Sequence, residues 1–369
     1  MMTMSSQPHS DAFDTYQSTR FFINLNGLRF ICIMMVLWYH APPTTIPGLA
    51  LTERGFLGVD FFFVLSGFLI TTLLLREEQR SGRVSLRNFW IRRIVRIIPV
   101  YFFVVSLVSA YFILLQGRYD YIQLLPFYYL FLSNFLTEHI PTLAPTWSLA
   151  AEEQYYLIWP VLLVFLPRRL IVPLLCVLIA LNVILVTGLL GPFAYATGVL
   201  VFKLPVATYA PILMGSLVAM MLHHRAAFTV LYRIFGHAWA SVVWFAGLLL
   251  VMQMAPPDLT GLPNLLIHAV MCAILICVVV RAHTPLSFLL TQPILARIGV
   301  VSYGIYLYHL LALDVTVRLL TLAGLISPWA IFLGYTALSW LMAEVSFRTL
   351  EAYFHRFRPA NPPRAQTSD

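Results

Sequence analysis

The chain has 369 residues, of which 60% are hydrophobic and only 10% are charged. Soluble domains carry about a quarter charged residues, so this composition excludes an ordinary water-soluble enzyme and predicts a protein that crosses a membrane several times. The net charge of +8 is explained by basic loops beside anionic lipid headgroups. The sequence contains no interleaved basic and aromatic patch of the kind that binds nucleic acid.

Apolar runs follow one another along the chain, each long enough to cross a hydrocarbon core of roughly 30 Å as a helix. We predict about ten such helices in an all-α polytopic bundle, with a membrane domain at 21–350. A polar tail, 1–20, precedes this domain, and a tail at 351–369 that we expect to be disordered follows it. The ten spans are predicted near 21–40, 57–75, 98–116, 148–166, 170–188, 204–222, 237–255, 263–281, 299–320 and 328–347.

Basic residues predict the orientation of these spans, because lysine and arginine concentrate in short cytoplasmic loops. If the N-terminus is inside, most of the 23 basic residues fall in the tails and in the inner loops, above all in 76–97. We therefore expect both termini to be cytoplasmic.

The first predicted span contains "LRFICIMMVLWYH", residues 28–40, with Arg29 and His40 in an otherwise apolar run. The two residues share one helix face, since the eleven positions between them make about three turns. Ionisable residues at membrane depth are costly and often functional. A buried ion pair for Arg29 and an interfacial position for His40 would explain them equally well.

The second predicted span contains "GFLGVDFFFVLSGFLIT", residues 55–71, and brings Asp60 to the expected depth of His40. This carboxylate could pair with Arg29 or orient His40. Ser66 and Gly67 are expected to allow close helix packing, as small residues do in membranes.

The basic stretch "REEQRSGRVSLRNFWIRRIVRIIP", residues 76–99, precedes the third predicted span. In the helix that we expect after Ser85, Arg92 and Arg96 share a face, with Arg93 beside them. The planar fork of arginine suits phosphate oxygens. Orientation and lipid-headgroup contact are an equally good explanation.

The stretch "PTWSLAAEEQYYLIWP", residues 145–160, has the pattern of a helix start, with Thr146 or Ser148 as cap. Glu152 and Glu153 lie in or near its first turn, where the helix dipole favours carboxylates. This helix also begins on the outer side, so both carboxylates are expected near the depth of His40. A carboxylate beside a histidine holds a general base in the required tautomer.

Two further features are expected to be structural. The four cysteines, Cys32, Cys176, Cys272 and Cys277, all fall in apolar spans, and we expect them to pack in the core, without disulfide or metal spacing. "HLLALD" gives His309 and Asp314 the spacing of glycerolipid acyltransferases. Five helical positions turn about 140°, so the two should not face each other, and His309 is expected to be hydrogen-bonded inside the bundle.

Five motifs in order resemble those of the membrane-bound acyltransferase-3 family over residues 24–350. They are "LRF…WYH", "GVDFFFVLSGFLIT", "NFWIRRIVRIIPVYF", "PTWSLAAEEQYYLIWP" and "IGVVSYGIYLYHLL". The resemblance implies a bacterial inner-membrane enzyme that moves an acyl group, usually acetyl, from acyl-coenzyme A to a hydroxyl. It implies a carbohydrate, lipid-linked glycan or macrolide acceptor, and it places the family's arginine, histidine and glutamate on Arg29, His40 and Glu152. We expect no additional esterase-like domain here.

The resulting hypothesis joins these residues into one reaction. Acyl-coenzyme A docks from the cytoplasm as a co-substrate, its phosphates near Arg92, Arg93 and Arg96, and its arm runs past Arg29. His40 then deprotonates the acceptor hydroxyl, and Glu152 or Asp60 steadies the imidazolium. An acyl-histidine intermediate stays open, and no bound cofactor or metal is expected.

The alternative function is a transporter or flippase for a glycan or a lipid-linked solute, because buried charges also suit a solute pathway. The sequence shows no pair of matching broken helices in two halves, which counts against this function. It leaves the oligomeric state open.

Overall fold

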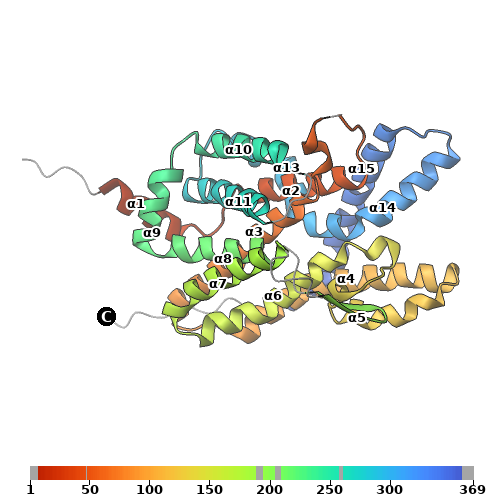
Figure 1. Ribbon diagram of the computed structural model, residues 1–369, viewed down its shortest axis with the longest axis horizontal. Coiled ribbons are helices and arrows are strands. Elements are labelled where there is room, and N and C mark those ends of the chain that lie inside the picture. Colours follow the sequence, from red (N-terminus) through yellow and green to blue (C-terminus); the bar gives the residue numbers. More distant parts are fainter. Residues whose placement is uncertain (1–6, 47, 188–193, 204–208, 257–260, 360–369) are drawn as a thin grey trace, which may run out of the picture.

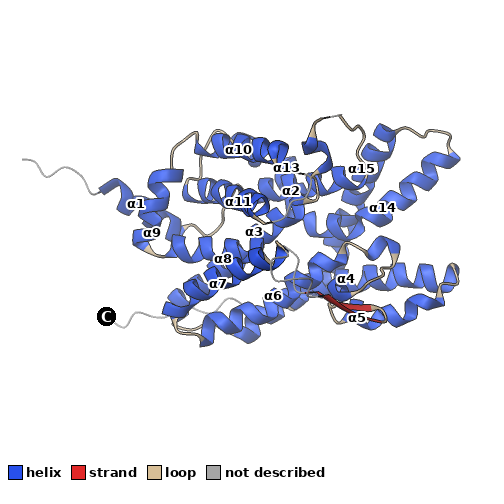
Figure 2. Ribbon diagram, viewed as in Figure 1, coloured by secondary structure: helices blue, strands red, loops and turns tan. Residues whose placement is uncertain are grey.

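The computed structural model describes residues 7–46, 48–187, 194–203, 209–256 and 261–359. Within them the chain forms a bundle of helices with one small hairpin (Figure 1, Figure 2). The α-helices are α1 (Gln7–Ser18), α2 (Leu25–His40), α3 (Leu57–Ser81), α4 (Leu86–Ala110), α5 (Leu125–Tyr129), α6 (Thr146–Phe165), α7 (Arg168–Val186), α8 (Ala210–His223), α9 (Arg225–Phe235), α10 (Ala240–Met254), α11 (Leu262–Val280), α12 (Ser287–Leu290), α13 (Pro293–Val300), α14 (Ser302–Leu322), α15 (Pro328–Ser346) and α16 (Ala352–His355).

Shorter elements join these helices. The 3₁₀ turns are η1 (Ala50–Glu53), η3 (Tyr119–Leu124), η4 (Ser133–Phe135) and η5 (Pro141–Leu143), and the π turns are η2 (Tyr111–Leu115) and η6 (Phe347–Glu351). Strands β1 (Ala194–Thr197) and β2 (Leu200–Lys203) pair antiparallel, with Thr197 opposite Leu200. The all-α expectation did not include this hairpin.

Every predicted span coincides with a helix, but the helices differ in length. In the described part of the chain, six are long and apolar enough to cross a membrane: α3, α4 with η2, α7, α11, α14, and α15 with η6 and α16. The bent pair α9 and α10 would make a seventh, while α2 and α8 are apolar but shorter. These helices support a multi-pass membrane protein, and the count of ten and the cytoplasmic termini stay predictions.

The basic segment 76–97 is largely helical instead of forming a loop. Helix α3 runs on to Ser81 and ends at Gly82, whose φ of 71° is left-handed. Helix α4 begins directly after Ser85, whose Oγ accepts a hydrogen bond from the N–H of Asn88 at 3.3 Å. This confirms the helix start expected after Ser85. Four of the seven arginines of this segment, Arg87, Arg92, Arg93 and Arg96, therefore lie on the first turns of α4.

Both predicted tails contain helix. The guanidinium of Arg76 donates to the carbonyl oxygens of Tyr16 (2.9 Å) and Thr19 (2.6 Å), which satisfies the open end of α1. At the other terminus η6 and α16 extend to His355, so the expectation of disorder from 351 onwards is wrong for this part. The rest of that expectation, 360–369, lies outside the described residues.

Helix α3 forms the centre of the bundle and packs against α2, α6, α8 and α11. It crosses α8 very closely, because a Cβ on Gly67 would lie 1.9 Å from the carbonyl oxygen of Ile212. This confirms the packing role expected for Gly67. In the most apolar 18-residue stretch of α11, 78% of the residues are buried, compared with only 17% in that of α7. Helix α7 therefore lies at the periphery.

The cysteines follow this division. Cys32, Cys272 and Cys277 are buried free thiols, as expected. Cys176 is exposed, so the expected core position is wrong for it, because α7 leaves most of its surface uncovered.

Candidate active site

A cavity lies between α2, α3, α4, α6 and α14, and most of the predicted site residues line it. Arginines, hydroxyls and one carboxylate share this cavity although they come from five different helices. Its polar lining comprises Arg29, Ser66, Arg93, Arg96, Ser148, Glu152, Tyr156, Ser302, Tyr303 and Tyr306.

Glu152 is the carboxylate of this cavity. Its Oε1 accepts hydrogen bonds from the hydroxyls of Ser66 on α3 and Tyr156 one helical turn further along α6. The sequence assigned only packing to Ser66, and it missed this bond because the partner lies on another helix. Glu153 is half-buried and does not belong to the described lining, in keeping with the turn of about 100° between neighbouring helical residues.

The start of α6 differs from the expected cap. Pro145 occupies the N-cap position, and the hydroxyl of Thr146 donates backwards to the carbonyl oxygen of Leu143 at 2.7 Å. The hydroxyl of Ser148 bonds to the carbonyl oxygen of Pro145 (3.0 Å) and to the hydroxyl of Tyr306 (2.7 Å). Neither hydroxyl caps the helix, and Ser148 instead connects α6 to α14.

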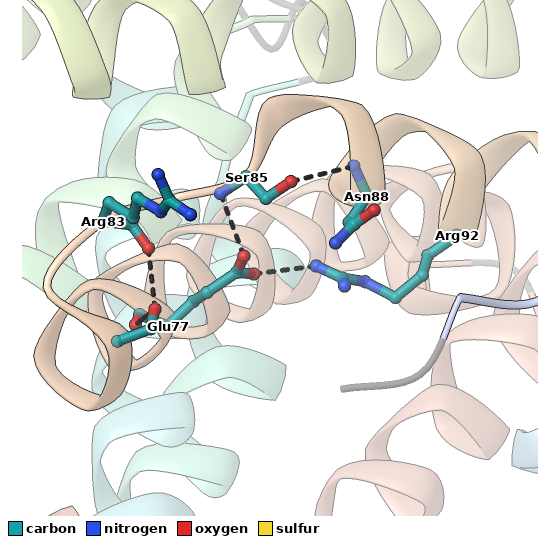
Figure 3. A network of polar contacts seen from close by, with 6 residues as sticks. Glu77, Arg83, Ser85, Asn88 and Arg92 are labelled. Atoms are coloured by element: carbon teal, nitrogen blue, oxygen red, sulfur yellow. Dashed lines mark hydrogen bonds and ion pairs between the residues drawn. The ribbon is translucent and has the colours of Figure 1, made fainter. Parts of the chain in front are cut away.

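The predicted arginine group divides into two. Arg93 and Arg96, three positions apart on α4, both line the cavity. Arg92 turns away to Glu77 of α3, with 2.8 Å between Nη2 and Oε2, and the other oxygen of Glu77 accepts the N–H of Ser85 at 3.0 Å (Figure 3). Arg92 thus fixes the turn between α3 and α4 and is not part of the described cavity lining, and its role at the donor stays a prediction.

The cavity arginines have no carboxylate in an ion pair within the described residues. Arg29 donates from Nη1 to the amide oxygen of Asn26 at 3.2 Å. The guanidinium of Arg93 lies over the rings of Phe89 and Tyr156, 5.6 Å from each centroid. The cavity therefore offers cationic groups whose charge no ion pair neutralises.

A second cavity shares Arg29, Arg96 and Tyr303 with the first. Residues of the C-terminal segment, among them His355 and Arg358, line its other side. Burial, together with repulsion by Arg96 and Arg92, lowers the pKa of Arg358. The two cavities thus share the arginines Arg29 and Arg96, and the second cavity also contains the carboxylate of Glu351.

His40 is the last residue of α2 and contacts His309 of α14. Their ring centroids are 4.6 Å apart and the rings are inclined at 71°. Nδ1 of His40 lies 2.9 Å from the carbonyl oxygen of Val36, and Nδ1 of His309 lies 2.6 Å from that of Tyr306. His309 is buried and hydrogen-bonded as expected, but its contact with His40 was not predicted.

Tyr306 connects this histidine pair to the first cavity. It lines the cavity, and its ring centroid is 5.5 Å from that of His309. His40 itself is not part of the described lining. Asp314 forms an ion pair with Arg318 at 2.8 Å, so it does not serve as a partner of His309, as the helical turn predicted.

Asp60 lies apart from the cavity lining. Its Oδ2 is 3.0 Å from Nε2 of His268 on α11, and the side chains are 17% and 2% exposed. The sequence had offered Arg29 or His40 as its partner, and the described contacts include neither. His268 could have been noticed as a lone histidine inside an apolar span.

Metal binding has no candidate among the described residues, because no group of three or more histidine, cysteine, aspartate or glutamate side chains is placed to hold an ion.

A family model described as an acyltransferase domain matches residues 22–343 of this chain. The peptidoglycan O-acetyltransferase OatA of Listeria monocytogenes is 28% identical over 390 residues, covering 94% of this chain and 59% of that protein. A putative O-acetyltransferase of Staphylococcus aureus is 35% identical over 170 residues, or 42% of this chain and 26% of that protein.

OatA of Staphylococcus aureus is 34% identical over 168 residues, or 41% of this chain and 26% of that protein. The chain thus spans about three fifths of the length of the Listeria relative. No solved structure matches it. Because the family model covers most of the sequence, the chain belongs to the acyltransferase-3 family of membrane-bound enzymes.

Proposed function

We propose that the protein is a membrane O-acetyltransferase that moves an acetyl group from acetyl-coenzyme A to a hydroxyl of a carbohydrate. The observation that carries this proposal is the cavity in which Arg29, Arg93 and Arg96 meet without carboxylate ion pairs, next to the histidine pair. Family membership supports acyl transfer, and the similarity to a peptidoglycan O-acetyltransferase supports an acetyl group and a cell-wall glycan.

The donor would enter through the second cavity. Coenzyme A carries several phosphates, and arginine binds phosphate through its paired N–H groups. Arg96 and Arg358 line this second cavity, and Arg93 lines the first. The thioester arm would then pass between Arg29 and Tyr303, which line both cavities. Arg92 would act indirectly, by holding the turn between α3 and α4.

His40 would act as the general base. Because Nδ1 donates to the carbonyl of Val36, the lone pair resides on Nε2. Nε2 removes the proton of the acceptor hydroxyl as that oxygen attacks the thioester carbonyl. The C–S bond then breaks, and the thiolate of coenzyme A takes up the proton from His40. The acetyl ester and free coenzyme A are the products.

Glu152 has a different place from the one expected. Its bonds to Ser66 and Tyr156 and its position among the cavity arginines support a role in orienting the donor arm. No described contact connects it to His40. We therefore assign Glu152 to the donor cavity, and Asp60, paired with His268, to the support of the fold.

The acceptor would approach His40 from the outer side of a bacterial inner membrane. His40 ends α2 at the opposite end from Arg29, which lies one turn into the helix. This separation, about 16 Å along a helix axis, lets the donor and the acceptor come from opposite sides. A cell-wall glycan, a lipid-linked glycan and a macrolide all present hydroxyls that could be acetylated.

The test uses purified full-length protein in nanodiscs with acetyl-coenzyme A and peptidoglycan fragments. We expect release of the coenzyme A thiol that requires the fragments, together with fragments heavier by one acetyl group in mass spectrometry. Replacing the fragments by a macrolide or by other glycans identifies the acceptor class. The proposal would be contradicted if the protein released no thiol and formed no acetylated product with any of these acceptors.

A transporter is the second candidate, because α9 and α10 are bent by 76° at a short break, as in the discontinuous helices of transporters. Inverted repeats would give a matching bent pair in the other half, and the described helices contain one such pair. Uptake of a labelled glycan into vesicles without coenzyme A release would favour this function.

A further inference from the structure

His309 lies in an uncommon environment for a polar side chain, and it has no role in the proposed reaction as described above. Its side chain is buried at 1% exposure, and its Nε2 has no hydrogen-bond partner among the described residues. Buried polar atoms are nearly always paired, so an unpaired nitrogen in the interior calls for an explanation. A phenylalanine would fill the same space without this cost.

The backbone determines which nitrogen of each ring carries the proton. A carbonyl oxygen can only accept a hydrogen bond, and the carbonyls of Val36 and Tyr306 lie next to Nδ1 of His40 and Nδ1 of His309. Both neutral rings therefore carry the proton on Nδ1 and a lone pair on Nε2. The two lone pairs belong to rings in edge contact, with centroids 4.6 Å apart.

The surroundings leave His309 uncharged. Burial disfavours the charged form of an imidazole unless a carboxylate compensates. In the described residues no carboxylate forms an ion pair with either ring. The rings of two tyrosines also lie against the pair, Tyr39 at 5.3 Å from His40 and Tyr306 at 5.5 Å from His309.

We propose that His309 is a positioning residue for acetyl transfer, whose neutral ring and free Nε2 lone pair stabilise the imidazolium that His40 becomes when it takes the acceptor proton. This inference rests on the proposed function. His309 gains and loses no proton in the reaction, and the thiolate of coenzyme A still takes the proton from His40. An electron-rich nitrogen and ring face beside a cation replace the carboxylate that commonly supports a catalytic histidine.

The competing explanation is structural, in which His309 only fills space and donates to Tyr306. Two amides separate these roles, because the amide of asparagine comes near the place of Nδ1 and that of glutamine near the place of Nε2. His309→Asn can keep the bond to the Tyr306 carbonyl but loses the acceptor at Nε2. His309→Gln can keep an acceptor there. His309→Phe keeps the ring and loses both nitrogens.

The experiment measures kcat and the KM for acetyl-coenzyme A for these variants in nanodiscs, with size-exclusion profile and melting temperature as folding controls. We expect kcat to fall about tenfold or more for His309→Asn and His309→Phe, and clearly less for His309→Gln, with KM unchanged. If His309→Phe does not fold, the pair of amide variants decides.

Wild-type kcat in His309→Asn, or a loss in His309→Gln as large as that in His309→Asn, would overturn the role of Nε2. A wild-type protein that releases no coenzyme A would instead overturn the proposed function.

Discussion

Two histidines in the bundle differ in the chemical type of their partners. His268 on α11 is paired with the carboxylate of Asp60 on α3 and is almost fully buried. His40 on α2 contacts the ring of His309, and its described contacts include no carboxylate. From the sequence we expected a carboxylate beside His40, and Asp60 was one candidate. In the structure Asp60 pairs with His268 instead.

This difference separates groups that hold the fold together from groups that are available for chemistry. A charge inside an apolar bundle is tolerated when a partner on another helix compensates it, and such a pair links the helices. The arginines show the same division, because Glu77 holds Arg92, while Arg93 and Arg96 line a cavity and form no ion pair with any carboxylate of the described residues. Groups without such a partner are therefore the candidates for binding and catalysis.

The largest effect is expected for His40→Ala. A general base contributes about 10²- to 10⁴-fold, so kcat should fall by at least about a hundredfold while the amount of protein in the membrane stays near normal. The measurement is coenzyme A release by the purified variant. The matched variant His268→Ala should show the reverse pattern, with less folded protein and near-normal turnover of what folds. Activity of His40→Ala within about tenfold of wild type would contradict the assignment.

The next effect concerns the two neighbouring glutamates. Glu152→Gln removes the charge that receives two hydroxyl donors in the cavity. Hydrogen bonds to a charged group contribute about 1.5 to 3 kcal/mol, so kcat should fall about 10- to 100-fold. Glu153→Gln is the control, and we expect a change of about twofold or less. Steady-state kinetics of both variants test this prediction, and a reversed order would show that the other face of α6 serves the reaction.

A smaller effect is expected for Arg96→Lys. Lysine keeps the charge but loses the paired N–H groups, so the KM for acetyl-coenzyme A should rise by about three- to tenfold with little change in kcat. Arg92→Lys keeps the charge opposite Glu77, at the turn between α3 and α4, and should leave this KM near its wild-type value. Equal increases in both variants would place Arg92 at the donor as well.

The smallest effect on turnover is expected for Asp60→Asn. The loss of a charge-assisted hydrogen bond to His268 should reduce stability by about 1.5 to 3 kcal/mol, seen as a lower melting temperature and less folded protein. Turnover per folded molecule should stay within about twofold of wild type. A normal melting temperature combined with lost turnover would show that Asp60 serves the reaction and not the stability of the fold.

The sequence predicted much of the candidate site because helical spacing is regular. Arg93 and Arg96 lie one turn apart on any helix, and Arg29 and Glu152 carry charges in apolar runs, which marks them whatever the fold. It did not predict the ion pair of Arg92, because Glu77 lies before the tight turn at Gly82, on the neighbouring helix α3. It also missed the contacts of Ser66 with Glu152, of Asp60 with His268 and of His40 with His309, because the two members of each pair lie far apart along the chain.

The sequence by itself determined where the ten predicted apolar helices lie, and six of the described helices are long and apolar enough to cross a membrane. Apolar length and backbone hydrogen bonding act within each segment, so every predicted span appears as a helix. Only the tertiary structure decided which side chains meet. The contact of His40 with His309 joins α2 to α14, and that of Asp60 with His268 joins α3 to α11. Such contacts depend on the rotation and depth at which packed helices settle, and no local pattern encodes these.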